Sequence, residues 1–200
     1  MSHHTVDYFF APQSPWTYLG HARFAQLVMS PKVEVRVKPV DLGKVFAVSG
    51  GLPLSQRPAQ RRAYRLVELE RFGRALGMPI HLHPKFFPVA GDPAARLIIA
   101  VDLAHGASAA MQLCGAIFAA VWAQERDIAN PEVLAELLHA QQLPVACLEA
   151  AQSESVQARY DTYTQEAIDM GVFGAPTYIV DGEMFWGQDR LDFVAQAVAR

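Results

Sequence analysis

A serine at the junction of a predicted strand and a predicted helix is the first residue placed to do chemistry. Segment 5–10 is β-branched and aromatic, as strands are, and Ser14-Pro15 then combines an N-cap residue with the proline favoured at the first helical position. The Ser14 hydroxyl and the free N–H groups of that turn would face a common point, which the helix dipole makes favourable for an anion, including a thiolate. The alternative is that Ser14 is only a structural cap, worth about 1 kcal/mol.

A second candidate is Ala175-Pro176, which stands directly before the predicted strand 177–180. Proline cannot donate to a sheet ladder, so it belongs at the start of a strand. A cis bond at this position would turn the backbone of Ala175 outward and offer its N–H and C=O to an extended, peptide-like ligand. The alternative is an ordinary trans proline, which is the commoner form.

A third candidate is the segment Trp186-Gly-Gln-Asp-Arg190, which ends a predicted hairpin and begins the last predicted helix. Asp189 would most simply be the cap of that helix. It is also suited to hold a ligand ammonium group, while nearby backbone N–H groups could hold a carboxylate on the same carbon.

Four arginines, Arg57, Arg61, Arg62 and Arg65, lie together at the predicted start of a helix. Such a cluster is usually a solvated face, but these arginines outnumber nearby acids, so one or two could clamp a carboxylate bidentately. His81-Leu-His83 places two imidazoles on one side of the chain without a third ligand nearby, so we expect no metal site.

The elements that must position these residues group at the two ends of the chain. We predict a strand at 5–10, a helix from Pro15 to about Met29 and a strand at 33–37. Near the other end we predict a hairpin, 177–180 and 183–186, followed by a helix. Between them the apolar spacing predicts five helices, at 66–76, 94–105, 109–124, 131–143 and 154–170. The prediction is an α/β fold in which a small domain, residues 1–40 and 171–200, is interrupted by an all-α domain, residues 41–170.

Composition narrows the class of protein further. The 200 residues are 52% hydrophobic and carry a net charge of −3, which excludes a disordered chain. The charge divides into +7 over residues 36–96 and −9 from residue 125 onward, so we expect an anionic ligand near the middle of the chain but no nucleic acid. The apolar run 97–101 is too short to cross a membrane. With no secretory pattern at the N-terminus, and with Cys114 and Cys147 expected as buried free thiols, we predict a cytoplasmic protein.

Three motifs, taken in order, resemble those of one family: Ser14-Pro-Trp-Thr-Tyr-Leu19, Gly171-Val-Phe-Gly-Ala-Pro-Thr177 and Phe185-Trp-Gly-Gln-Asp-Arg-Leu191. The chain resembles the 2-hydroxychromene-2-carboxylate isomerases, which belong with kappa-class glutathione transferases and disulfide oxidoreductases. The resemblance covers nearly the whole chain. It implies a thioredoxin-like domain with an inserted α-helical domain, glutathione as cofactor, a small aromatic carboxylate as substrate and a homodimer.

The resemblance also implies roles for individual residues. Ser14 matches the catalytic serine that activates the glutathione sulfur. The expected glutathione-binding residues are Ala175, Pro176, Trp186, Gly187, Gln188, Asp189 and Arg61. The expected substrate-binding residues are Gln56, Arg57 and Phe87. Asp189 would meet the γ-glutamyl ammonium, and the basic segment would form one wall of a cleft that receives carboxylates.

The resemblance leaves three activities open. Ser14 and Thr17 stand where a Cys-x-x-Cys pair would be, so disulfide exchange is excluded at this site. The leading hypothesis is glutathione-dependent isomerisation of 2-hydroxychromene-2-carboxylate to trans-o-hydroxybenzylidenepyruvate, a step in naphthalene breakdown. A kappa-like transferase acting on another electrophile is the alternative among enzymes, and a non-catalytic thioredoxin-like binding module is the alternative outside them.

Overall fold

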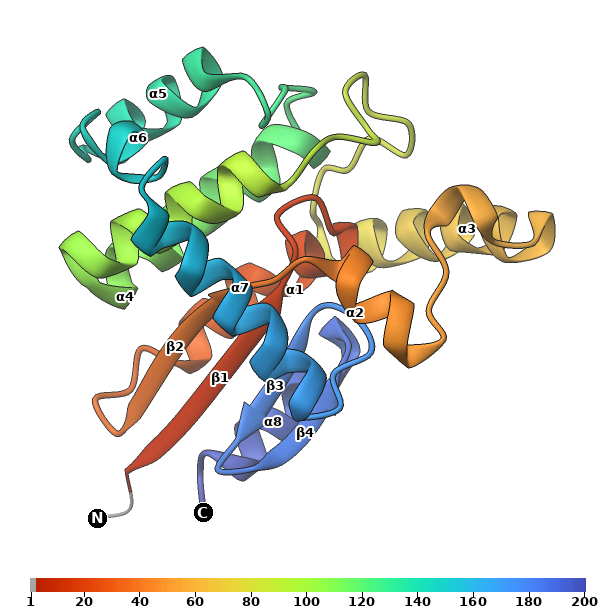
Figure 1. Cartoon of the computed structure of the whole chain (residues 1–200). Helices are drawn as coiled ribbons and strands as arrows, with labels where there is room; N and C mark the ends of the chain where they lie inside the picture. Colours follow the sequence, from red (N-terminus) through yellow and green to blue (C-terminus); the bar gives the residue numbers. More distant parts are fainter. Residues whose placement is uncertain (1–2) are drawn as a thin grey trace.

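The computed structural model describes residues 3–200, and within them the strands form one four-stranded sheet in the order β2-β1-β3-β4 (Figure 1). Its members are β1 (His4–Phe10), β2 (Val33–Pro39), β3 (Thr177–Val180) and β4 (Glu183–Trp186). Strand β1 pairs parallel with β2 and antiparallel with β3, and β3 pairs antiparallel with β4. The strands predicted at the two ends of the chain therefore meet in one sheet.

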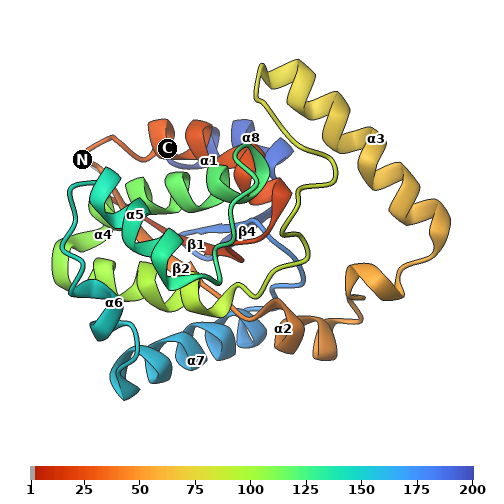
Figure 2. The same ribbon diagram turned by 90° about the horizontal axis from the view of Figure 1, so that it is seen from above.

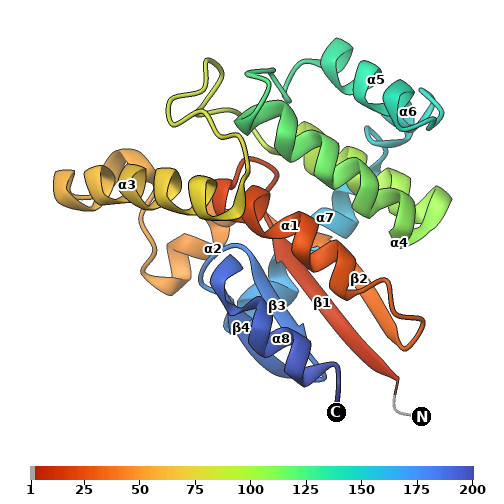
Figure 3. The ribbon, with the colours of Figure 1, turned by 180° about the vertical axis from the view of Figure 1, so that it is seen from behind.

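Helices cover both faces of this sheet. Helices α1 (Pro15–Leu27) and α8 (Leu191–Ala197) lie on one face, and α7 (Glu154–Asp169) lies on the other, as Figures 1 and 3 show from opposite sides. The core between α1 and the sheet is aromatic. The Tyr8 ring stacks on Tyr178 at 5.4 Å between centroids and lies 4.5 Å from Phe24. These contacts fix α1, and with it the turn at Ser14, against the central strands.

The elements between β2 and β3 are helical, in agreement with the predicted insertion. Besides α7, they are α2 (Leu42–Ser49), the 3-10 turn η1 (Leu54–Gln56), α3 (Ala59–Leu76), α4 (Asp92–Trp122), α5 (Pro131–Ala140) and the short α6 (Cys147–Ala150). Helix α3 reaches away from the body of the molecule and contacts α1 (Figure 2). The α/β class with inserted helices is confirmed, while the domain limits at 40/41 and 170/171 stay a prediction.

Helix α4 folds back on itself. Gly106 has φ 82° and ψ 170°, a conformation open to glycine, and it divides α4 into the segments 92–105 and 107–122, which lie side by side in Figure 2. The sequence predicts these two helices separately. Among the described residues α4 is the helix long and apolar enough to cross a membrane, with a mean hydropathy of 1.5. Its segments instead pack against β2, α1 and α7, so they belong to the core.

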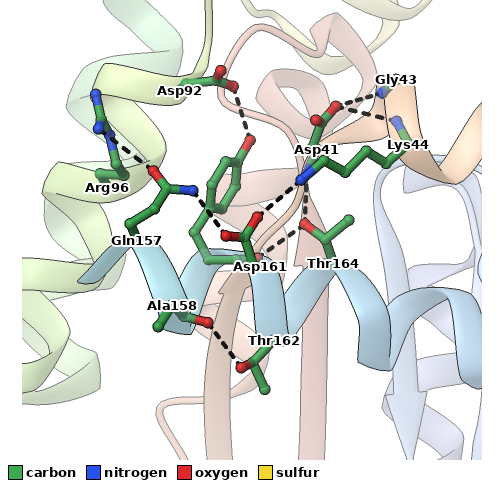
Figure 4. Close-up of polar contacts among 11 residues, drawn as sticks. Asp41, Gly43, Lys44, Asp92, Arg96, Gln157, Ala158, Asp161, Thr162 and Thr164 are labelled. Carbon is green, nitrogen blue, oxygen red and sulfur yellow. Dashed lines mark hydrogen bonds and ion pairs between the residues drawn. The ribbon is translucent and has the colours of Figure 1, made fainter. Parts of the chain in front are cut away.

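Polar contacts tie α7 to the beginnings of α2 and α4 (Figure 4). The Asp41 N–H donates to Thr164 Oγ1 at 3.0 Å, and Lys44 Nζ lies 2.9 Å from Asp161 Oδ1. The Tyr160 hydroxyl donates to Asp92 at 3.0 Å. Asp41 also caps α2, because its carboxylate accepts from the N–H groups of the first turn. These contacts hold α2 where its side chains can reach the cleft described next.

The structure confirms the prediction for the two cysteines and corrects the one for Asp189. Cys114 and Cys147 are free and buried, as predicted. Asp189 is not a helix cap: it lies in the 3-10 turn η2 (Gln188–Arg190), and the N-cap of α8 is Arg190, without a capping side-chain bond. The reason is that one tight turn separates the hairpin from α8, so Asp189 stands before the helix rather than at its first turn.

Candidate active site

A cleft with two lobes lies where α1, α3 and the end of β4 meet. The larger lobe, of about 870 Å³, contains Ser14 and is called the serine lobe. The smaller, of about 650 Å³, contains Asp189 and is called the aspartate lobe. Both volumes are in the range of small-molecule sites. The residues that line both lobes are Trp16, Arg57, Arg61, Arg65, Ala175 and Trp186, so the two lobes form one continuous cleft.

Ser14 is positioned by α1, of which it is the N-cap. Its backbone is extended, with φ −77° and ψ 122°, Pro15 follows at the first helical position, and Ser14 Oγ accepts from the Thr17 N–H at 3.3 Å. The side chain lines the serine lobe although Ser14 is only 8% exposed. The hydroxyl proton remains free to donate to a ligand beside the positive end of the helix dipole. The capping role and a ligand-binding role are therefore compatible in the same side chain.

Ala175 lines both lobes from the loop before β3. The Ala175–Pro176 peptide bond is cis. Among the described residues the backbone N–H and C=O of Ala175 take part in no hydrogen bond, whereas the Pro176 carbonyl accepts from the Gly187 N–H at 2.9 Å. Ala175 thus presents unpaired backbone groups to the cleft, and Pro176, which is buried and lines neither lobe, ties the loop to the end of β4.

Trp186, the last residue of β4, lines both lobes. The residue is 51% exposed, and its indole packs on the Phe173 ring, with 4.7 Å between centroids. A Cβ at position 174 would overlap Trp186 Nε1, so only glycine allows the indole to lie this close to the loop. The exposed pair of aromatic rings forms the rim of the serine lobe.

The turn after β4 presents Asp189 to the aspartate lobe. Gly187 has φ 107°, which only glycine adopts readily, and the Asp189 carboxylate pairs with Arg190 at 2.7 Å. Gln188 is 2% exposed, and both its backbone and side-chain oxygens accept from Arg23 of α1. Gln188 therefore anchors the turn to α1, while the neighbouring Asp189 stays accessible to a ligand.

Three arginines before and within α3, namely Arg57, Arg61 and Arg65, line both lobes and are called the arginine row. Arg57 Nε donates to the Leu52 carbonyl at 2.8 Å. Burial, and then the charge of Arg61, lowers the pKa of Arg57. The predicted basic wall thus lies in the cleft.

Not all of the predicted residues in and around α3 face the cleft. Arg62 is exposed and lines neither lobe, and the same is true of Gln56, whereas Gln60 lines the aspartate lobe. Phe87 lines the serine lobe.

Residues from α2 also reach the cleft and were not predicted. Phe46 lines the serine lobe, and a Cβ at the adjacent Gly51 would overlap its ring, so the glycine makes room for Phe46. The sequence signal that could have predicted α2 is the pair of caps at its two ends, Asp41 and Gly50.

The side chains of His81 and His83 are exposed, and within residues 3–200 no group of three or more His, Cys, Asp or Glu could hold a metal ion.

A mixed sheet with helices on both faces, interrupted after β2 by a helical segment, defines a thioredoxin-like protein. The chain belongs to the family of DSBA-like thioredoxin domains, whose model matches residues 5–199. The resemblance to 2-hydroxychromene-2-carboxylate isomerases that the motifs indicate is confirmed by comparison with known proteins. The chain is 29% identical to a 2-hydroxychromene-2-carboxylate isomerase from Pseudomonas putida, over 98% of this chain and 94% of the relative.

Two further comparisons agree. A 2-hydroxychromene-2-carboxylate isomerase from Sphingobium xenophagum is 26% identical, over 95% of each chain. A solved structure of a 2-hydroxychromene-2-carboxylate isomerase superimposes with a TM-score of 0.77 at 28% identity, over 98% of this chain and 95% of that one. The similarity therefore extends over both the sheet and the inserted helices.

Proposed function

We propose that this protein is a glutathione-dependent isomerase that interconverts 2-hydroxychromene-2-carboxylate and trans-o-hydroxybenzylidenepyruvate. The observation that carries the proposal is Ser14 at the start of α1, facing a cleft with Thr17 one turn behind it. Disulfide chemistry needs two thiols at these positions, whereas a hydroxyl at a helix N-terminus suits an exogenous thiolate. The similarity to isomerases over nearly the full length of the chain supports this substrate class.

The residues of the cleft fit glutathione. Asp189 offers a carboxylate for the γ-glutamyl ammonium, and Ala175 offers an unpaired N–H and C=O for the cysteinyl backbone. Trp186 stands between these two positions, and Gly187 and Gln188 shape the turn that carries Asp189. Arg61 is suited to one of the two glutathione carboxylates. A γ-glutamyl tripeptide would thus run from the aspartate lobe toward Ser14.

Ser14 would hold the glutathione sulfur as a thiolate, because a hydrogen bond from Oγ and the positive end of α1 both favour the charged form. When bound, glutathione supplies a nucleophile that adds reversibly to the conjugated carbon of the ring-opened substrate, so that a double bond becomes a single bond able to rotate before the thiol leaves. The protein's own residues then have to hold the substrate while that rotation occurs.

The serine lobe would hold the aromatic acid. Phe87 and Trp16 provide aromatic walls, and Arg57 adds positive charge for the substrate carboxylate. Gln56 lies outside both lobes, so any role for it would require a rearrangement of η1. We further propose that the protein works in the cytoplasm as a homodimer, where a reducing environment keeps its two cysteines free.

The direct test is isomerase activity of the purified protein on 2-hydroxychromene-2-carboxylate with and without glutathione. We expect turnover that depends on glutathione, and a Ser14→Ala variant that retains the fold but turns over about a hundredfold more slowly. Thr162→Ala, at an exposed position of α7 that lines neither lobe, is the matched control. Equal rates with and without glutathione, or no turnover, would refute the proposal.

Transferase activity is the second candidate, because the aspartate lobe is complete whichever electrophile enters the serine lobe. Conjugation of glutathione to a chlorinated nitrobenzene, measured beside the isomerase assay, separates the two activities. A transferase rate with no isomerase rate would assign the protein to the kappa-like transferases.

A further inference from the structure

The charges of the cleft do not balance. Both acidic side chains that line it already have basic partners, since Glu68 pairs with Arg71 and Asp189 with Arg190. The three cations of the arginine row have no acidic partner within residues 3–200. Cations gathered in a partly closed cleft repel each other unless an anion joins them. The cleft is therefore built for a ligand, or a pair of ligands, with several negative charges.

Arg65 differs from the other two arginines of the row because its guanidinium lies beside two aromatic rings. Its guanidinium carbon lies 5.4 Å from the centroid of the Phe87 ring and 5.6 Å from that of Trp122, which is fully buried. The two rings are themselves 4.8 Å apart. Cation–π contacts of this length fix the guanidinium in place and favour arginine over lysine, because the planar group can lie along the rings.

The guanidinium of Arg65 is nevertheless open to the cleft. It donates to no group within residues 3–200, yet none of its nitrogens is sealed from solvent, in contrast to Nε of Arg23 and of Arg96. Burial, and then the charge of Arg57, lowers the pKa of Arg65 to about 10. The group is still positively charged at neutral pH, so it is a partly desolvated cation with free donors.

The position of Arg65 points to the electrophile rather than to glutathione. Arg65 itself lines both lobes, but Phe87, against which its guanidinium lies, lines the serine lobe and not the aspartate lobe. A carboxylate held by Arg65 would therefore belong to a ligand whose ring lies beside Phe87 and whose reacting carbon is in the same lobe as Ser14. The more exposed Arg61 is left for glutathione.

We propose that Arg65 determines substrate specificity by binding the carboxylate of a planar aromatic acid, and that the serine lobe discriminates against uncharged analogues of the same shape. The inference rests on the proposed function only in assigning the serine lobe to the electrophile. It goes further in naming the residue that selects the charge of the substrate. Two parallel N–H donors meet the two carboxylate oxygens, a geometry that an amide or ester cannot reproduce.

The test is equilibrium binding, by calorimetry, of trans-cinnamate and of trans-cinnamamide, which has the same shape without the charge. We expect the wild-type protein to prefer the acid by about tenfold. Arg65→Gln should bring the two affinities to within about twofold of each other. Arg62→Gln, a neighbouring exposed arginine outside both lobes, is the matched control and should keep the wild-type ratio.

A wild-type protein that binds both probes equally, or an Arg65→Gln variant that keeps the preference, would overturn the inference. Arg65→Lys retains the charge and is the second variant if Arg65→Gln does not fold. In Arg65→Lys the preference for the acid over the amide should fall at least about threefold, and an unchanged preference would also overturn the inference. Glutathione affinity should stay at the wild-type value in Arg65→Gln, and a loss confined to glutathione would assign Arg65 to the tripeptide instead.

Binding of these probes requires no turnover, so the outcome is separate from that of the isomerase assay. A protein without isomerase activity that loses its acid preference in Arg65→Gln would support Arg65 as a carboxylate-binding residue while refuting the proposed reaction. An active isomerase whose Arg65→Gln variant keeps the preference would support the proposed reaction while refuting the role of Arg65.

Discussion

His21, in the middle of α1, should make the fold sensitive to acid. Its side chain is buried, with 6% of the residue exposed. Nε2 donates to the Met111 carbonyl of α4 at 2.9 Å, and Nδ1 accepts from the Tyr8 hydroxyl at 3.3 Å. Both ring nitrogens are thus used by the neutral imidazole. Burial, opposed in part by the bond to Met111, lowers the pKa of His21 from 6.5 to about 4.

The magnitude follows from this shift. The unfolded chain binds a proton at His21 below about pH 6.5, whereas the folded protein does so only below about pH 4, so stability falls as the pH falls through this window. Each pKa unit corresponds to about 1.4 kcal/mol, which gives a total loss of about 3 kcal/mol. About 2 kcal/mol of it should be lost between pH 7 and pH 5. Above pH 6.5 His21 adds no pH dependence.

Urea unfolding at pH 7 and pH 5 measures this loss. His21→Gln keeps a side-chain N–H that can donate to the Met111 carbonyl but does not titrate between these pH values. The wild-type protein should lose about 2 kcal/mol more stability than His21→Gln when the pH falls from 7 to 5. His105→Gln, at an exposed position of α4, is the control and should behave as wild type. Equal losses in wild type and His21→Gln would refute the reasoning.

Four further predictions concern the cleft and the assembly. Glutathione at about a hundred times its Kd should add about 2.7 kcal/mol to the unfolding free energy of the wild type. Asp189→Asn should raise that Kd about tenfold, with exposed Asp192→Asn as control; an unchanged Kd would separate Asp189 from the ligand. Gly174→Ala should displace Trp186 and weaken glutathione binding severalfold by calorimetry, and normal affinity would show that the indole need not lie there. Light scattering should give about twice the 22.0 kDa chain mass, and a monomer would contradict the proposed dimer.

The parts of the fold that could be predicted are those with strong local signals. The hairpin of β3 and β4 has the predicted bounds because Asp181-Gly182 supplies the positive φ angles that its turn requires. The two segments of α4 were predicted because each has its own apolar spacing, although nothing local indicated that they lie side by side. Helix α2 was missed because its eight residues are too few to show a clear helical period.

The general position of the site could be predicted, but not which side chains of α3 face it. Ser14 and Asp189 line the cleft because strand ends and tight turns fix them locally. Before and within α3 the sequence offers four arginines, and only the orientation of the helix decides that Arg62 points away while Arg65 lies against Phe87. Asp189 was predicted as a possible helix cap because the turn η2 between the hairpin and α8 has no sequence signature of its own.

The two walls of the serine lobe come from different parts of the chain. Ser14, Ala175 and Trp186 lie at or near the ends of strands of the sheet, whereas the opposite wall consists of residues between Leu42 and Val89. Mutations in that second segment can reshape the lobe without disturbing the turn at Ser14 or the loop before β3. Under the proposed function, substitutions in the segment between Leu42 and Val89 would change which electrophile the serine lobe accepts, while Ser14, Ala175 and Trp186 keep their places.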